Sequence, residues 1–220
     1  MSDRLDHIVD EWNTLYANKD YSHEASREIG KCTIDETDGD PKLKSLIIDN
    51  LDGISFPAKV MDSFTCWDAV NEMNCDGAFL VKEKSDEYNL VFCEMKSKYD
   101  TKKISRARGQ IIETAKKLNI LLNNLDSFHD ADIKSTYGII ACNAPDDKQL
   151  MWIKNMAQLP EAELGHHKFA IKLYQKKDIT IPLPLPSDKK GAIMKHIIPD
   201  KITIHLCCTE KNTITYSLPN

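Results

Sequence analysis

The sequence predicts an α/β (α+β) fold in which a mixed central β-sheet of about four strands is flanked by helices, with extra strands at the C-terminal end. Two short β-prone runs, 78–81 and 90–93, flank a polar stretch as the strands of a hairpin do. Apolar residues then recur every three or four positions from Ile104 to Leu122, which predicts a long amphipathic helix. The next apolar run, 137–142, predicts a third, buried strand.

The N-terminal part of the chain, up to about residue 60, is predicted to be mainly helical. Helical spacing of apolar residues favours one helix from Asp3 to Tyr16, a second from about Ser22 to Cys32, and a short third from Lys42 to Leu51. Charged residues and turn formers predict a loop over 35–41. The segment from Phe64 to Met73 also favours a helix.

Residues 161–220 are predicted to form a C-terminal β extension to a core that spans 61–160. The length of 220 residues suits a single hydrophobic core, so we expect one domain over 1–220. The elements expected in the second half are a helix from Asp146 or Asp147 to about Gln158, a fourth strand over 169–174, and a terminal hairpin of 202–207 and 213–218.

The composition favours a cytoplasmic protein without a membrane partner. No apolar stretch approaches the roughly 20 residues that span a bilayer, and the first residues lack the pattern of a signal peptide. The seven cysteines include no CxxC pair, so we expect reduced, mostly buried thiols rather than a zinc site.

Several aromatic residues are predicted to have structural rather than functional roles. Trp12, Trp67 and Trp152 occupy apolar helical positions and are expected in the core, not as platforms for stacking bases. His166 and His167 are expected to be exposed loop residues, because nothing near them in the sequence completes a site.

Positive charge is concentrated in one stretch of an otherwise acidic chain. The net charge is −5, but residues 96–117 contain eight basic and two acidic side chains. This stretch includes Lys98, Lys103 and Arg106, which we expect near the backbone of a nucleic acid. The alternative is that these residues form an ordinary solvated helix face.

The candidate site is the trio Asp76, Glu94 and Lys96. Side chains alternate along a strand, so Glu94 and Lys96 point to the same side, and Asp76 begins the partner strand of the hairpin. Two carboxylates, helped by the backbone carbonyl of Met95, can hold Mg²⁺ or Mn²⁺. A lysine beside them can orient the attacking water or stabilise developing charge, which suits phosphodiester hydrolysis. The alternative is a surface salt bridge between Glu94 and Lys96 or Lys98.

Asp76 followed by Glu94-Met95-Lys96 resembles the signature of the PD-(D/E)xK nuclease superfamily, which has the restriction-endonuclease-like fold. The resemblance extends over the element order from about residue 24 to 159, with Cys75 in the place of the signature proline. It implies a further metal-site carboxylate, Glu28 before Glu24, and a substrate-side glutamine, Gln110.

The function that this resemblance implies is a metal-dependent endonuclease that acts on DNA in preference to RNA, such as a restriction or phage-defence effector. With no sequence-reading module in the chain, a homodimer or a separate regulatory or targeting protein would supply specificity. Two alternatives are a catalytically silent nucleic-acid-binding or regulatory protein with a nuclease-like fold, and a protein-interaction domain without affinity for nucleic acid.

Overall fold

A mixed sheet of eight strands forms the centre of the part of the chain that the computed structural model describes, which is residues 3–17, 23–36, 42–62, 73–84, 86–129, 131–184 and 198–218. The strands are β1 (Ser26–Asp35), β2 (Ser45–Phe56), β3 (Gly77–Lys84), β4 (Glu87–Lys96), β5 (Asp132–Asn143), β6 (Asp178–Pro182), β7 (Lys201–Thr209) and β8 (Thr213–Ser217). The helices are α1 (Arg4–Trp12), α2 (Ala58–Asp62), α3 (Thr101–Leu122), α4 (Asp147–Met156) and α5 (Lys168–Lys176), and a π-helical segment, Asn13–Ala17, continues α1. The predicted class, a mixed sheet flanked by helices, is confirmed at this level.

The sheet has an antiparallel part and a parallel part, to which β6 adds an antiparallel edge strand and β8 a parallel one. Its strand order is β1-β2-β3-β4-β5-β7-β6, and β8 pairs with β2 outside this path. Strands β1 to β4 pair antiparallel, whereas β4, β5 and β7 pair parallel, with α3 as the crossover between β4 and β5. The sheet therefore has more strands than the predicted core of about four, because β1 and β2 from the N-terminal part and the extra C-terminal strands join it.

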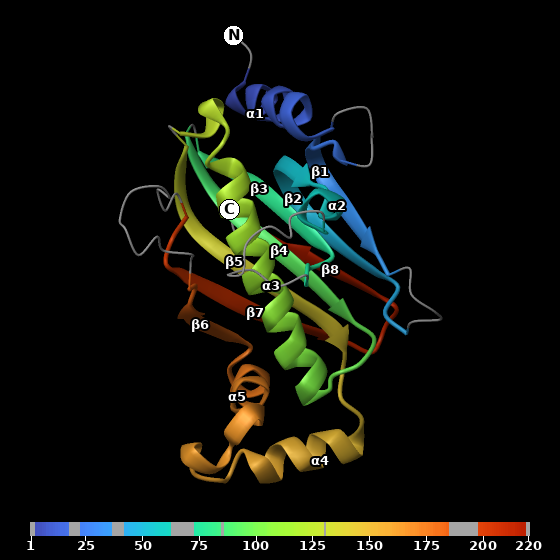
Figure 1. The fold of residues 1–220 in the computed structure, drawn as a ribbon. Coiled ribbons are helices and arrows are strands. Elements are labelled where there is room, and N and C mark those ends of the chain that lie inside the picture. Colours follow the sequence, from blue (N-terminus) through green and yellow to red (C-terminus); the bar gives the residue numbers. More distant parts are fainter. Residues whose placement is uncertain are drawn as a thin grey trace.

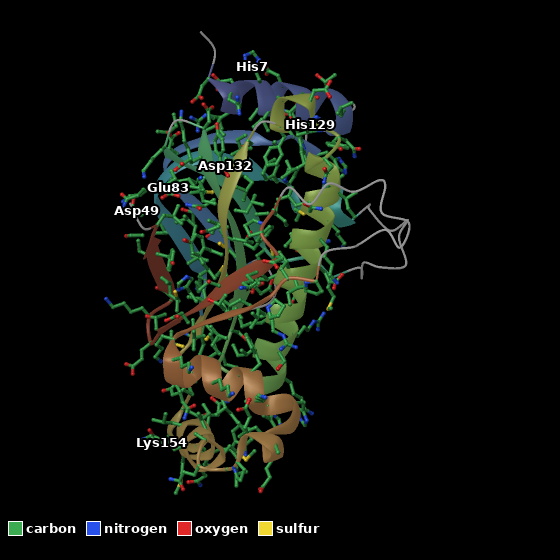
Figure 2. The ribbon with its side chains drawn as sticks, turned by 90° about the vertical axis from the view of Figure 1, so that its left-hand side faces the viewer. His7, Asp49, Glu83, His129, Asp132 and Lys154 are labelled. Atoms are coloured by element: carbon green, nitrogen blue, oxygen red, sulfur yellow. The ribbon has the colours of Figure 1, made fainter. Side chains whose placement is uncertain are left out.

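Helix α3 covers one face of the sheet and runs across β4 and β5 (Figures 1 and 2). Its predicted apolar stripe is confirmed: Ile104, Ile111 and Leu118 have no exposed surface. They share one hydrophobic cluster with Leu90 and Phe92 of β4. Figure 1 shows α4 and α5 beyond the end of the sheet at which α3 begins, and α1 near its other end.

A bend in β2 covers part of the opposite face. Asn50 has a left-handed backbone (φ 60°) and is the extra residue where the register between β1 and β2 shifts, opposite Gly30 (φ 87°). The first half of β2 pairs with β8, and its second half pairs with β3. Ile48 of the bent half packs in one cluster with Val91 of β4 and Ile139 of β5.

Two helices predicted in the N-terminal part are wrong. Residues 26–35 and 45–56 are the strands β1 and β2, so the first 60 residues are not mainly helical. In the first segment Gly30 lies in the interior and Thr33 and Ile34 are β-branched, all of which disfavour a helix. In the second, Leu46 and Ile48 fit the alternation of a strand as well as helical spacing, and pairing with three neighbours decides the outcome.

The C-terminal extension also differs from the prediction. Residues 168–176 form α5 and not a strand, because Phe169, Ala170 and Leu173 bury one helical face. Both C-terminal strands exist, but they are not a paired hairpin: β7 pairs with β5 and β6, and β8 pairs with β2.

The hairpin β3–β4, the helices α1 and α4, and the strand β5 are confirmed. The helix predicted from Phe64 to Met73 lies outside the described residues except for Met73, and so does most of the loop predicted over 35–41. Within the described ranges, six cysteines are free thiols and no helix is long and apolar enough to cross a bilayer.

A substitution at Gly53 tests whether β2 and β3 approach each other as closely as the structure shows. A Cβ atom at this position would lie 2.2 Å from the backbone carbonyl oxygen of Leu80, which cannot move without breaking the sheet. We expect Gly53→Ala to lower the free energy of unfolding by about 3 kcal/mol, measured by urea denaturation. The matched control is Gly109→Ala in α3, where only the flexible end of Met73 lies within 4 Å. This control should stabilise the protein by about 0.5–1 kcal/mol, and equal effects of the two substitutions would contradict the pairing.

Candidate active site

The structure brings Asp76, Glu94 and Lys96 together at one end of the β3–β4 hairpin. Gly77 pairs with Cys93, so Asp76 directly precedes β3 and lies beside the last residues of β4. The backbone N–H of Met95 donates a hydrogen bond of 2.6 Å to Oδ2 of Asp76. Because the N–H and C=O of one strand residue point to the same side, the Met95 carbonyl faces the β3 side of β4, as its N–H does.

Glu94 is the buried member of the trio. Its side chain is 1% exposed, and Oε1 accepts a hydrogen bond from Nζ of Lys96, so the predicted alignment of these two side chains is confirmed. The other oxygen, Oε2, is buried without a hydrogen-bond partner among the described atoms. Burial and the nearby charge of Asp76 raise the pKa of Glu94 to about 8, against the opposing effects of Lys96 and of a hydrogen bond from the Asp76 backbone to this carboxyl group.

These residues fit a divalent cation. Within the described ranges no group of three or more His, Cys, Asp or Glu side chains is arranged to hold a metal. Mg²⁺, however, usually takes one or two carboxylates and fills its remaining positions with water and substrate phosphate. The partnerless oxygen of Glu94 and the repulsion between Glu94 and Asp76 are both features that a cation would relieve.

Helix α3 holds the segment that carries Asp76. Thr114 Oγ1 accepts a hydrogen bond of 2.8 Å from the backbone N–H of Cys75. Gln110 Nε2 donates to the carbonyl of Asn74 at 2.7 Å, and the buried Lys117 donates to Oδ1 of Asn74 at 2.8 Å. Three side chains on one helix therefore fix the backbone immediately before Asp76.

Two of these anchoring residues were not identified from the sequence as site residues. Thr114 lies three positions after Ile111 and four before Leu118, so a polar side chain occupies the buried stripe of α3. The sequence alone therefore indicates that Thr114 is a buried polar residue. Lys117 is fully buried although it belongs to the basic stretch, and its ammonium also lies 3.5 Å from the Met73 carbonyl oxygen.

Gln110, predicted to lie on the substrate side, donates its amide N–H to the Asn74 carbonyl. This hydrogen bond helps to position the Asp76 segment, and its role toward a substrate stays a prediction. Lys98, Lys103 and Arg106 are exposed, as predicted for residues that contact a polyanion. Lys103 donates to Ser97 Oγ at 3.4 Å, next to the trio in sequence.

The structure does not bring Glu28 or Glu24 to the site. Glu28 lies on β1 rather than on a helix, and β2 and β3 separate it from β4. Its carboxylate accepts hydrogen bonds from Ser26 at 2.7 Å and Ser55 at 3.1 Å. Glu24 precedes β1 and is exposed.

Comparison with known proteins adds no further assignment. No protein-family model matches the chain, and no curated protein or solved structure matches it significantly. The chemistry of the site is therefore argued from its own geometry.

The raised pKa of Glu94 predicts a pH-dependent stability in the absence of metal. Between the ordinary pKa of 4.5 and about 8, the folded protein holds a proton on Glu94 that the unfolded chain has released. The contribution of Glu94 to the free energy of unfolding is therefore fully present below pH 4.5 and is lost as the pH rises through about 8. In EDTA, we expect the wild type to lose on the order of 2 kcal/mol over this window relative to Glu94→Gln, measured by thermal unfolding. Parallel pH profiles of the two proteins would show that Glu94 is not perturbed.

Proposed function

We propose that this protein is a metal-dependent nuclease that hydrolyses phosphodiester bonds at the Asp76–Glu94–Lys96 trio. The observation that carries the proposal is the buried Glu94 carboxylate, which has one oxygen paired with Lys96 and the other without a partner, beside a second carboxylate. A buried charge cluster of this kind is costly for stability and is typical of functional sites.

The three side chains have distinct roles in the proposed reaction. Asp76 and Glu94 would hold Mg²⁺ or Mn²⁺, with the carbonyl of Met95 as an additional oxygen donor. When bound, the cation would supply Lewis-acid polarisation of the scissile phosphate. Lys96 projects on the same side as Glu94, where its ammonium can bind a non-bridging phosphate oxygen and offset the charge that develops there.

The fold around the trio supports this proposal. The elements β3, β4, α3 and β5 follow one another in the order strand, strand, helix, strand, with β5 parallel to β4. This order agrees with the resemblance of the motif to the PD-(D/E)xK superfamily. Asp76, directly before β3, and Glu94 and Lys96, at the end of β4, lie at the same end of the hairpin, which supports the proposal.

The substrate that we favour is DNA, on the basis of that resemblance. Exposed basic residues at the start of α3 can contact its phosphates. We further propose a homodimer or a separate targeting protein as the source of control, and a role as a restriction or phage-defence effector in the cytoplasm. Each of these extensions depends on the nuclease activity itself.

Removing Lys96 tests the activity. With Mg²⁺ or Mn²⁺ we expect the wild type to cut DNA, supplied both as plasmid and as single strands, and Lys96→Ala to be at least about 100-fold slower, because the transition-state charge loses its partner. Lys134→Ala is the matched control, since Lys134 is a partly exposed lysine at the start of β5 that pairs with Glu87 and Asp132. EDTA should stop all cutting.

The opposite outcome would favour the alternative function. If no metal supports cleavage of DNA or RNA, while the protein binds nucleic acid equally well with Mg²⁺ and with EDTA, the chain is a silent binder with a nuclease-like fold.

The basic residues predict a salt-dependent affinity. Removing one protein–phosphate interaction reduces the slope of log affinity against log salt concentration by about 1. We expect Arg106→Ala and Lys103→Ala each to reduce the slope by about this amount, measured by fluorescence anisotropy with a DNA oligonucleotide in EDTA. Lys154→Ala on α4 is the control with an exposed lysine elsewhere (Figure 2). An unchanged slope in both test variants would show that phosphates do not pass over this end of α3.

A further inference from the structure

A cavity of about 310 Å³ lies outside the trio, between the start of α3 and the helix α4. It is formed at the carboxyl ends of the parallel strands β4 and β5, where ligands of open sheets characteristically bind. Figure 1 shows α4 beyond this end of the sheet. The volume is at the lower end of the range for small-molecule sites, so it suits a single ring system.

Trp152 forms one wall of this cavity. Its side chain was expected in the core, but it lies on α4 with 38% of its surface exposed, which corrects that prediction. The indole packs edge-on against the His167 ring at 5.1 Å, and His167 Nδ1 is 2.9 Å from Thr101 Oγ1 of α3. The ring is therefore held at one edge while part of its surface remains open.

The chemistry of the cavity favours a neutral, flat ligand over a phosphate. Trp152, Ile153 and Tyr99 line it together with the polar side chains of Asp100, Thr101, Lys148 and Gln149, so acidic and basic groups are both present. The two helix N-termini that could have bound an anion are already capped, because Asp100 accepts from two backbone N–H groups of α3 and Asp146 accepts from one of α4. These carboxylates would also repel a phosphate.

The position of the cavity connects it to the trio. Tyr99 follows Lys96 by three residues, and the exposed Lys98 lies between them. Lys148 lines the cavity itself, on the α4 side. If the proposed nuclease function holds, a nucleic acid strand with one phosphate at Lys96 would have Lys98 and Lys148 as further basic residues between that phosphate and the cavity.

We propose that this cavity binds one unstacked nucleobase of the substrate strand, with Trp152 as the stacking surface. The inference rests on the proposed nuclease function and specifies its substrate class. A base inside a duplex is stacked on its neighbours and cannot enter, so the substrate is single-stranded nucleic acid or a strand with an unpaired end.

The experiment compares binding of a single-stranded DNA of about 12 nucleotides, within the usual site size of a single-strand binder, with binding of its blunt duplex. Fluorescence anisotropy is measured with the complete protein in EDTA, so that cleavage plays no part. Stacking of one base contributes about 1–3 kcal/mol, so Trp152→Ala should weaken single-strand binding about 5- to 150-fold. Duplex binding should change less than twofold. Trp152→Phe should restore most of the single-strand affinity, which a purely structural defect would not predict.

Met151→Ala is the matched control, because Met151 is the neighbouring residue on α4, is 66% exposed and does not line the cavity. Equal losses for single strand and duplex, or no loss in Trp152→Ala, would overturn the base subsite even if the wild type cuts DNA with Mg²⁺. A selective loss in a protein that never cuts would instead retain the subsite and remove the proposed hydrolysis. Absence of any nucleic-acid binding would overturn both.

Discussion

The packing of α3 on β4 is the constraint on which the fold and the candidate site both depend. The apolar stripe of the helix buries one face of the central strands, and this hydrophobic burial is the main source of stability for the crossover between β4 and β5. On the same helix Thr114, Gln110 and Lys117 hold the backbone at 73–75. The interaction that forms the core therefore also sets the place of Asp76.

The site combines this rigid support with an unfavourable charge arrangement. Glu94 is almost completely removed from water, and its neighbour Asp76 adds repulsion that Lys96 only partly offsets. The fold tolerates this cost because the trio lies at the end of the sheet, next to solvent, and the centre of the sheet is apolar. A cation and a phosphate at this position would supply the missing counter-charge and the missing partner for Glu94 Oε2.

The sequence was informative where local patterns and tertiary contacts favour the same structure. The hairpin, α3 and the alignment of Glu94 with Lys96 follow from simple periodicity, and the structure confirms them. Periodicity was insufficient for β1 and β2, whose short apolar runs suit a helix or a strand and acquire their form from distant partners such as β8. The same limit applies to Gln110 and Trp152. The partner of Gln110 is Asn74, which lies 36 residues away in the sequence. Trp152 is partly exposed, and a helical pattern of apolar residues does not encode exposure.

The most direct test of the central claim is to locate a metal ion at the trio. A crystal of the protein grown with saturating Mn²⁺ and measured at a wavelength where manganese scatters anomalously would show where the cation binds. The account predicts an anomalous peak between the carboxylates of Asp76 and Glu94, within about 2.0–2.4 Å of an oxygen from each. Ordered density for both side chains with no peak between them would contradict it.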